Sequence, residues 1–387
     1  MKTIPNQKPI VAGKSTIATK LTLLLVGFAL LGFCLFMLLP WKPGGFLYDL
    51  DGSWANGMHV IFRDKIQFGR DFIYTYGPYG FLQVNLYYPE TYSYLFIFRF
   101  LIAVATWAGL FRIVRHCVSL GKGSTFFLLP VLVFFPAGPI WMDLFQFTLL
   151  ALLPLIYFYV SKKIGPALVM TIVIAALASL TKLSYMVVCV GFLILITLDE
   201  GFNLKRFPRI IGIYLAFIVA FWLIAAQNLT DIPLYLINGL QIIKGFGANM
   251  GTPGRLSEVL IYVFGVGTFL SLVGIVELKN KNWWRILPVL SFVGLFFIVF
   301  KGAFTRHDSH ALQAFFNATP TILITTALLW SKIIQTKWNL NRKLKVPAIA
   351  AVVIYLATFF SLGAFVLNNH VNYGYSGFAQ KIGRKYK

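Results

Sequence analysis

The chain has 387 residues, of which 58% are hydrophobic and 12% are charged, and its mean hydropathy is +0.77. Soluble domains are about 45–50% apolar and about 25% charged, so this composition excludes a soluble enzyme, a nucleic-acid-binding module and a disordered protein. The net charge of +22 then reflects membrane topology, and the three cysteines, spread through apolar runs, make neither a disulfide framework nor a zinc site.

Apolar stretches divide the chain into predicted membrane helices, each of which needs about 20 mostly apolar residues. We predict an all-α polytopic membrane protein with eleven transmembrane helices, folded as a single transmembrane domain over residues 1–387. The predicted spans are residues 21–40, 93–112, 125–141, 144–160, 165–180, 185–198, 209–227, 258–277, 286–301, 314–331 and 346–367. The first follows a basic segment but is too long for a signal peptide, so we expect a retained anchor.

Charge sets the predicted orientation. With the N-terminus in the cytoplasm, the inner segments carry 20 Lys and Arg residues and the outer segments carry 13. This is the positive-inside bias, and it makes residues 368–387 a short external tail. Nine of the twelve acidic residues and four of the five histidines fall outside. We therefore expect any chemistry on the external face.

The first external loop, residues 41–92, begins with two carboxylates, Asp49 and Asp51. Apolar residues then recur at helical spacing over residues 53–66, which predicts an amphipathic helix lying on the membrane surface. Asp51 either caps this helix or acts as a general base or metal ligand that activates an acceptor hydroxyl. Asp49 is the second candidate for the same role.

The same loop continues with a charged pair and a run of aromatic residues. Arg70 and Asp71 form either a local ion pair that braces the loop or a substrate contact. Tyr74 and Tyr76 can stack on a sugar, or can belong to an interfacial aromatic belt.

The external loop at residues 227–257 has a helical apolar pattern from Asp231 to Ile243, which predicts a second surface helix. Lys244 and Arg255 follow among several glycines. They are either phosphate ligands or solvated surface cations.

Ionisable residues also crowd the external loop at residues 301–313. Lys301 and Arg306 suit the phosphate of a lipid-linked substrate, because a guanidinium can hold two phosphate oxygens at once. The other candidates bind substrate, ligate a metal or cap the next helix: His307, Asp308 and His310.

Two further cations lie at membrane depth. Lys182 occupies the minimal external turn between two predicted spans, where a charge is costly and marks a functional candidate, although it can also snorkel to the interface. Arg99 lies inside the second span, near its external end, and we expect it to snorkel.

These features resemble the GT-C superfamily of membrane glycosyltransferases. The most specific match is to the GRDxxFTYGPLGFL segment of a poorly characterised bacterial GT-C-like family. The matching segments are Asp51–Trp54, Phe68–Leu82, Lys182–Tyr185, Leu234–Met250 and Arg306–Asp308.

The resemblance implies an inverting glycosyltransferase on the external face of the bacterial plasma membrane. It would move a sugar from a polyprenyl-phosphate donor to an envelope glycan, lipid or protein, among membrane lipids and without nucleic acid. By position Asp51, then Asp49, is the catalytic base or holds a divalent metal such as Mg or Mn. Lys182, Arg306 and Lys301 would bind the donor phosphate.

Two other functions stay open at this point: a transporter or lipid-linked-sugar flippase, and a non-catalytic scaffold in envelope polysaccharide assembly. The spans show no clear mid-membrane acid and no obvious internal repeat, which argues against a transporter. The transferase hypothesis requires Asp49, Asp51, Lys182 and Arg306 to face one external cavity.

Overall fold

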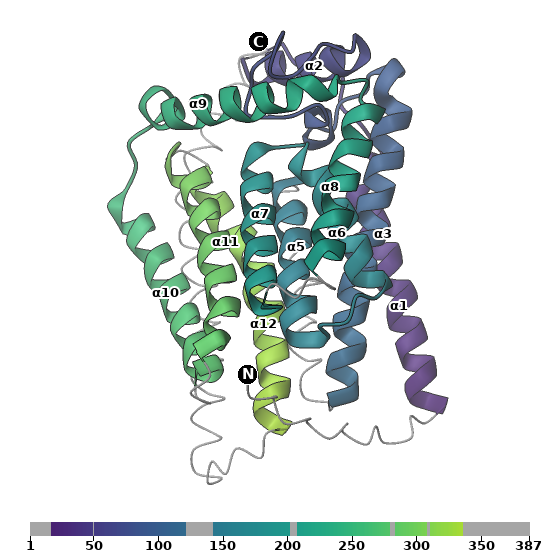
Figure 1. Cartoon of the computed structure of the whole chain (residues 1–387), viewed down its shortest axis with the longest axis vertical. Coiled ribbons are helices and arrows are strands. Elements are labelled where there is room, and N and C mark those ends of the chain that lie inside the picture. The colour runs from purple at the N-terminus through teal and green to yellow at the C-terminus, as the bar shows by residue number, and fades with distance from the viewer. Residues whose placement is uncertain are drawn as a thin grey trace, which may run out of the picture.

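The computed structural model describes residues 17–48, 50–120, 142–201, 207–278, 283–307 and 310–335. Every named element within these residues is helical, as predicted, and the extended segments there form only isolated β-bridges. Long helices run along the molecule and two helices, α2 and α9, lie across one end, which we call the α9 end (Figure 1).

The elements in chain order are α1 (Ile17–Leu38), α2 (Leu50–Arg63), η1 (Gly80–Gln83), α3 (Pro89–Leu120), α5 (Met142–Leu155), the π-helix η3 (Ile156–Val160), α6 (Pro166–Ser179), α7 (Leu183–Asp199), α8 (Phe207–Ile224), η4 (Leu229–Asp231), α9 (Ile232–Met250), α10 (Leu256–Leu278), η5 (Trp283–Arg285), α11 (Ile286–Phe304) and α12 (His310–Gln335).

Five helices among the described residues are long and apolar enough to cross a membrane: α1, α3, α10, α11 and α12. The pair α8 and α9 passes the same test only as one broken span, bent by 116°. Three further apolar helices are shorter, at 10–17 residues: Phe145–Val160, Pro166–Ser179 and Leu183–Asp199. The predicted spans 125–141 and 346–367, and the tail 368–387, lie outside the described residues, so the count of eleven stays a prediction.

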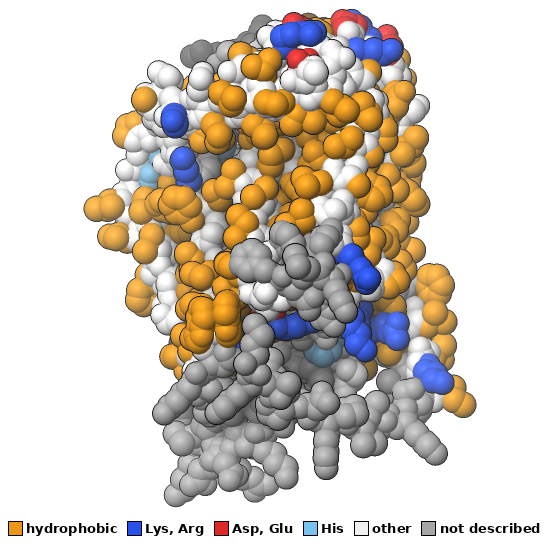
Figure 2. All heavy atoms as spheres, in the orientation of Figure 1, with side chains coloured by type: hydrophobic (Ala, Val, Ile, Leu, Met, Phe, Trp, Pro, Cys, Tyr) orange, Lys and Arg blue, Asp and Glu red, His pale blue; other side chains and the backbone are white. Residues whose placement is uncertain are grey.

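The flank of the molecule between its two ends has the surface that a membrane requires. Hydrophobic side chains cover it, and the acidic side chains visible on this face gather beside α2 (Figure 2). The shorter helices α5, α6 and α7 are buried among the longer ones, which fits helices that are apolar on every side.

The helices α2 and α9 are the two surface helices expected from the sequence, although α2 begins earlier, at Leu50, and α9 ends later, at Met250. Two glutamines join the first loop to the bend before α9. The side chain of Gln67 donates to the carbonyl of Ala226 (3.1 Å), and the oxygen of the Gln227 side chain accepts from the backbone N–H of Phe68 (2.8 Å). This clasp connects segments about 160 residues apart in the chain.

A glycine lets α9 come close to the first loop. Gly69 has a φ of +89°, and a Cβ at this position would overlap the backbone of Tyr235 in α9. The Gly69 carbonyl accepts a hydrogen bond of 2.8 Å from the side chain of Asn238. The glycine of the Gly69-Arg70-Asp71 sequence therefore has a packing role.

Candidate functional site

A buried polar cluster lies under the crossing helices at the α9 end. We call it the Lys182 cluster, and its members are Gln83, Asp143, Lys182 and Tyr185. Gln83 ends η1, Asp143 lies in the first turn of α5, and Lys182 and Tyr185 begin α7. Four separate segments of the fold thus meet at one place.

The carboxylate of Asp143 is the centre of this cluster. Both its oxygens lie 3.3 Å from Nζ of Lys182, and the hydroxyl of Tyr185 donates a short hydrogen bond to it. Gln83 in turn donates to the Tyr185 oxygen (2.6 Å). The side chains of Lys182 and Asp143 are 24% and 18% exposed, so the pair is mostly buried but is not sealed off.

Backbone pairing with the first loop positions Lys182. The Leu183 N–H donates to the Thr75 carbonyl (3.0 Å), and the Gly77 N–H donates to the Thr181 carbonyl (3.1 Å). A Cβ at Gly77 would overlap the carbonyl of Leu180. The loop segment and the lysine turn, which the sequence resemblance singled out separately, are thus one unit in the structure.

The environment keeps Lys182 charged. Burial alone disfavours the ammonium group, but the Asp143 carboxylate and the Tyr76 side chain outweigh it and raise the pKa of Lys182 above its usual value. The ammonium is held by Asp143 instead of extending to the interface, so Lys182 does not snorkel. The site holds a fixed positive charge at neutral pH.

Aromatic rings connect the Lys182 cluster to α2. Trp54 stacks on Tyr76 with ring centroids 4.9 Å apart, Tyr74 stacks on Tyr76 at 5.6 Å, and Nζ of Lys182 lies 5.3 Å from the centre of the Tyr76 ring. The ring of Tyr76 is therefore packed against the chain's own side chains. A sugar contact for Tyr74 or Tyr76 stays a prediction.

The two carboxylates of the first loop are only partly visible. Asp49 lies outside the described residues, and the structure describes the backbone of Asp51 in the first turn of α2 but not its side chain. Trp54 follows Asp51 by three residues, which is about one helical turn. The backbone of Asp51 is therefore near the residue that stacks over the Lys182 cluster.

Arg70 and Asp71 form the local ion pair that was one of their two expected roles. Two bonds of 3.1 and 3.3 Å join them, and Arg70 also lies 3.7 Å from Asp231 at the start of α9. The hydrogen bond from Arg70 holds the pKa of the Asp71 carboxyl below its usual value. The pair is half exposed and braces the loop against α9.

A second polar place surrounds the turn between α11 and α12. Nε2 of His307 lies 2.9 Å from a carboxylate oxygen of Glu258 in α10, and both side chains are buried. Arg306 is half-buried beside Thr252, with which it forms a β-bridge, and Lys301 is exposed at the end of α11. His310 is half-buried at the start of α12, and Asp308 lies outside the described residues. Their substrate-binding roles stay predictions.

The helix α9 passes over both places. Gly239 faces Leu183, next to Lys182, whereas Gly247 faces Thr305, next to Arg306. These glycines are eight residues apart, or about 12 Å along the helix axis. The predicted phosphate-binding cations therefore form two groups under one helix, and a single phosphate does not account for both.

No group of three or more His, Cys, Asp or Glu side chains among the described residues is placed to hold a metal ion. The Asp49 residue and the Asp51 side chain are outside that description. A divalent metal at these two residues stays a prediction.

Sequence reasoning missed Asp143, the partner of Lys182. The same logic would have found it, because Asp143 lies in a minimal external connection between two predicted spans, just as Lys182 does. Tyr185 and Glu258 gave no comparable signal, since each lies in an apolar run.

The expectation that Arg99 snorkels is wrong. Its side chain is buried, with only 4% of the residue exposed, and donates to the carbonyls of Leu82 and Val84 and to the side chain of Asn85. The first loop folds back beside α3, so these acceptors satisfy the guanidinium below the surface. Arg99 thereby supports the turn that carries Gln83.

Comparison with protein-family models, with curated proteins and with solved structures finds no match.

Proposed function

We propose that the chain is a membrane glycosyltransferase that moves a sugar from a polyprenyl-phosphate donor to an envelope glycan, lipid or protein acceptor. The Lys182 cluster is the observation that carries this proposal. It is a fixed cation, held by a carboxylate and partly accessible, where apolar helices end beneath two crossing helices.

The position of the cluster suits the two halves of such a donor. A polyprenyl chain must stay in lipid, whereas its sugar must reach water. Apolar flanks with amphipathic helices across one end are suited to both. A cation already in place, away from bulk water, stabilises the negative charge that develops on a departing phosphate.

The reaction is a single displacement. The acceptor oxygen bonds to the anomeric carbon as the bond from that carbon to the phosphate oxygen breaks, and the configuration inverts. The acceptor's proton passes to one carboxylate, so one base is enough. We assign this base to Asp51, with Asp49 second, because Asp143 is already bonded to Lys182 and Tyr185 and serves to position Lys182.

Lipid and glycan analysis of a deletion strain tests the proposal. We expect the deletion to accumulate a polyprenyl-phosphate sugar and to lack a glycan, and the wild-type chain to restore both. Asp51→Asn keeps helix-capping capacity but removes the proton acceptor, so transfer should fall by about 10²-fold or more. Asp49→Asn, the matched control, should lose less. Unchanged lipids and glycans in the deletion strain would favour a scaffold.

The proposal places the α9 end outside the bacterial plasma membrane and the N-terminus in the cytoplasm. Asp64 at the α9 end and Lys163 at the opposite end are both exposed, and the three native cysteines are buried. A membrane-impermeant thiol reagent should label Asp64→Cys in intact cells, and Lys163→Cys only after permeabilisation. The reverse pattern would overturn the orientation.

A further inference from the structure

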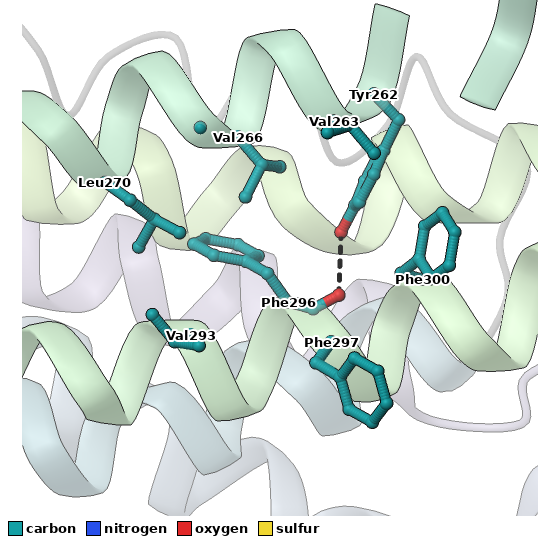
Figure 3. A pocket seen from close by; sticks show the side chains of 9 residues that line it. Tyr262, Val263, Val266, Leu270, Val293, Phe296, Phe297 and Phe300 are labelled. Carbon is teal, nitrogen blue, oxygen red and sulfur yellow. Dashed lines mark hydrogen bonds between the residues drawn. The ribbon is translucent and has the colours of Figure 1, made fainter. Parts of the chain in front are cut away.

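An apolar groove of about 320 Å³ runs between α10 and α11 on the flank of the molecule. Figure 3 shows Val266, Leu270 and Val293 around it. The one hydroxyl at the groove belongs to Tyr262, and it donates to the carbonyl of Phe296 (3.1 Å). The groove therefore offers a ligand apolar contacts and no free hydroxyl.

The groove opens sideways, where lipid would surround a membrane protein. Val263 and Phe297 on its two edges are 52% and 59% exposed. Gly267 lines it and has no heavy atom within 4 Å of the position that a Cβ would take. The space beside Gly267 is thus open.

Cations lie at the end of this groove nearest α9. Phe300 lines the groove, and the next residue, Lys301, is exposed. The N–H of Thr252 donates to the carbonyl of Thr305 (3.2 Å), which brings the strand before Arg255 beside Arg306. Figure 2 shows Lys and Arg side chains on this flank close to α9.

We infer that this groove holds the polyprenyl chain of a polyprenyl phosphate, with the phosphate at Lys301. The inference rests on the proposed function and says where the donor's lipid enters. One apolar groove with a cationic end matches a ligand with one chain and one phosphate. A two-chain phospholipid would leave its second chain outside, so the shape favours the single-chain ligand. From Val293 to Phe300 the groove follows about 10 Å of helix.

Photolabelling of the full chain in phosphatidylcholine nanodiscs tests the inference. The probe is a polyprenyl phosphate with a diazirine on its chain, and the labelled peptides are identified by mass spectrometry. We expect label on α10 and α11. Gly267→Leu fills the groove and should reduce this label about tenfold, which corresponds to the loss of a few dozen Å² of apolar contact. Gly274→Leu is the matched control, because Gly274 lies on the same helix, is equally unobstructed and does not line the groove.

Two further arms make the outcome decisive. Lys301→Gln should weaken labelling in the same region, and excess unlabelled polyprenyl phosphate should compete where phosphatidic acid does not. Equal labelling of Gly267→Leu and Gly274→Leu would overturn the inference, and so would equal competition by phosphatidic acid. The readout is binding, so labelling without any transfer activity would refute the proposed function and leave the groove assignment standing.

Discussion

Buried charge occurs at both ends of the helix bundle, but the two ends use it differently. At the end opposite α9, Arg285 pairs with Glu277 and Lys162 pairs with Asp199. At the α9 end, Lys182 pairs with Asp143. A buried ion pair by itself therefore does not mark a functional site.

The difference lies in access and surroundings. The side chain of Glu277 is fully buried and its cation belongs to the short connection before α11, so the pair ties helix ends together. The Asp143–Lys182 pair keeps partial exposure and has a phenol, an amide and stacked aromatic rings around it. We conclude that the first pair stabilises the fold and that the second is available to a ligand.

Arg285→Ala is the change that should most disturb the fold. It leaves the carboxylate of Glu277 buried without its cation, so the free energy of unfolding should fall by about 3–5 kcal/mol. Denaturant titration of the purified protein in detergent micelles measures this. The double variant Glu277→Gln/Arg285→Met removes both charges and should recover most of the loss. A change below about 1 kcal/mol in Arg285→Ala would place this pair among weak surface pairs.

The double variant Asp143→Asn/Lys182→Met should separate activity from stability. Removal of both charges leaves no lone buried ion, so the stability should stay within about 1–2 kcal/mol of the wild type. Transfer should fall by about 10²–10³-fold, because a fixed positive charge for the leaving phosphate is lost. Glu277→Gln/Arg285→Met is the control and should keep transfer. Equal loss in both double variants would erase the distinction between the ends.

Acid should loosen the α9 end through His59. Burial, with Arg99 adding to it, lowers the pKa of His59 from 6.5 to about 4. The unfolded chain binds the proton first as pH falls, so this contribution to stability is complete above pH 6.5 and is lost as the pH falls toward 4. The loss amounts to about 3 kcal/mol at most.

Hydrogen exchange of α2 between pH 7 and pH 4.5 measures this effect. His59→Asn offers a side-chain oxygen where Nδ1 accepts or donates to Thr91 at 2.6 Å, but it does not titrate, so its α2 should show a flatter pH response. The same slope in the variant would assign the acid sensitivity to other groups.

Two glycines with positive φ compare the backbone at the two ends. Gly69→Ala meets both a φ of +89° and the backbone of Tyr235, so the free energy of unfolding should fall by about 2 kcal/mol. Gly201→Ala, at the opposite end, has a φ of +63° but open space, and should cost roughly 1 kcal/mol. Thermal unfolding of the two variants decides, and equal losses would show that contact with α9 adds nothing.

Much of the candidate site was accessible from the sequence. Charge bias and loop length identified Lys182, the first loop and the 301–313 turn, because a charge at membrane depth is costly and therefore rare. The helical pattern after Asp231 identified α9. The partner of Lys182 was missed only because Asp143 was not compared with the lysine in the equivalent connection.

The sequence by itself determined that the chain is all-helical and apolar, and which loops carry its polar residues, because local periodicity and hydropathy act along the chain. Only the tertiary structure decided which polar groups meet. Asp143 and Lys182 are 39 residues apart, and Glu258 and His307 are 49 apart. The burial of Arg99 likewise depends on a loop folding back beside α3. Such pairings follow from how helices pack, and one helix does not encode the position of its neighbour.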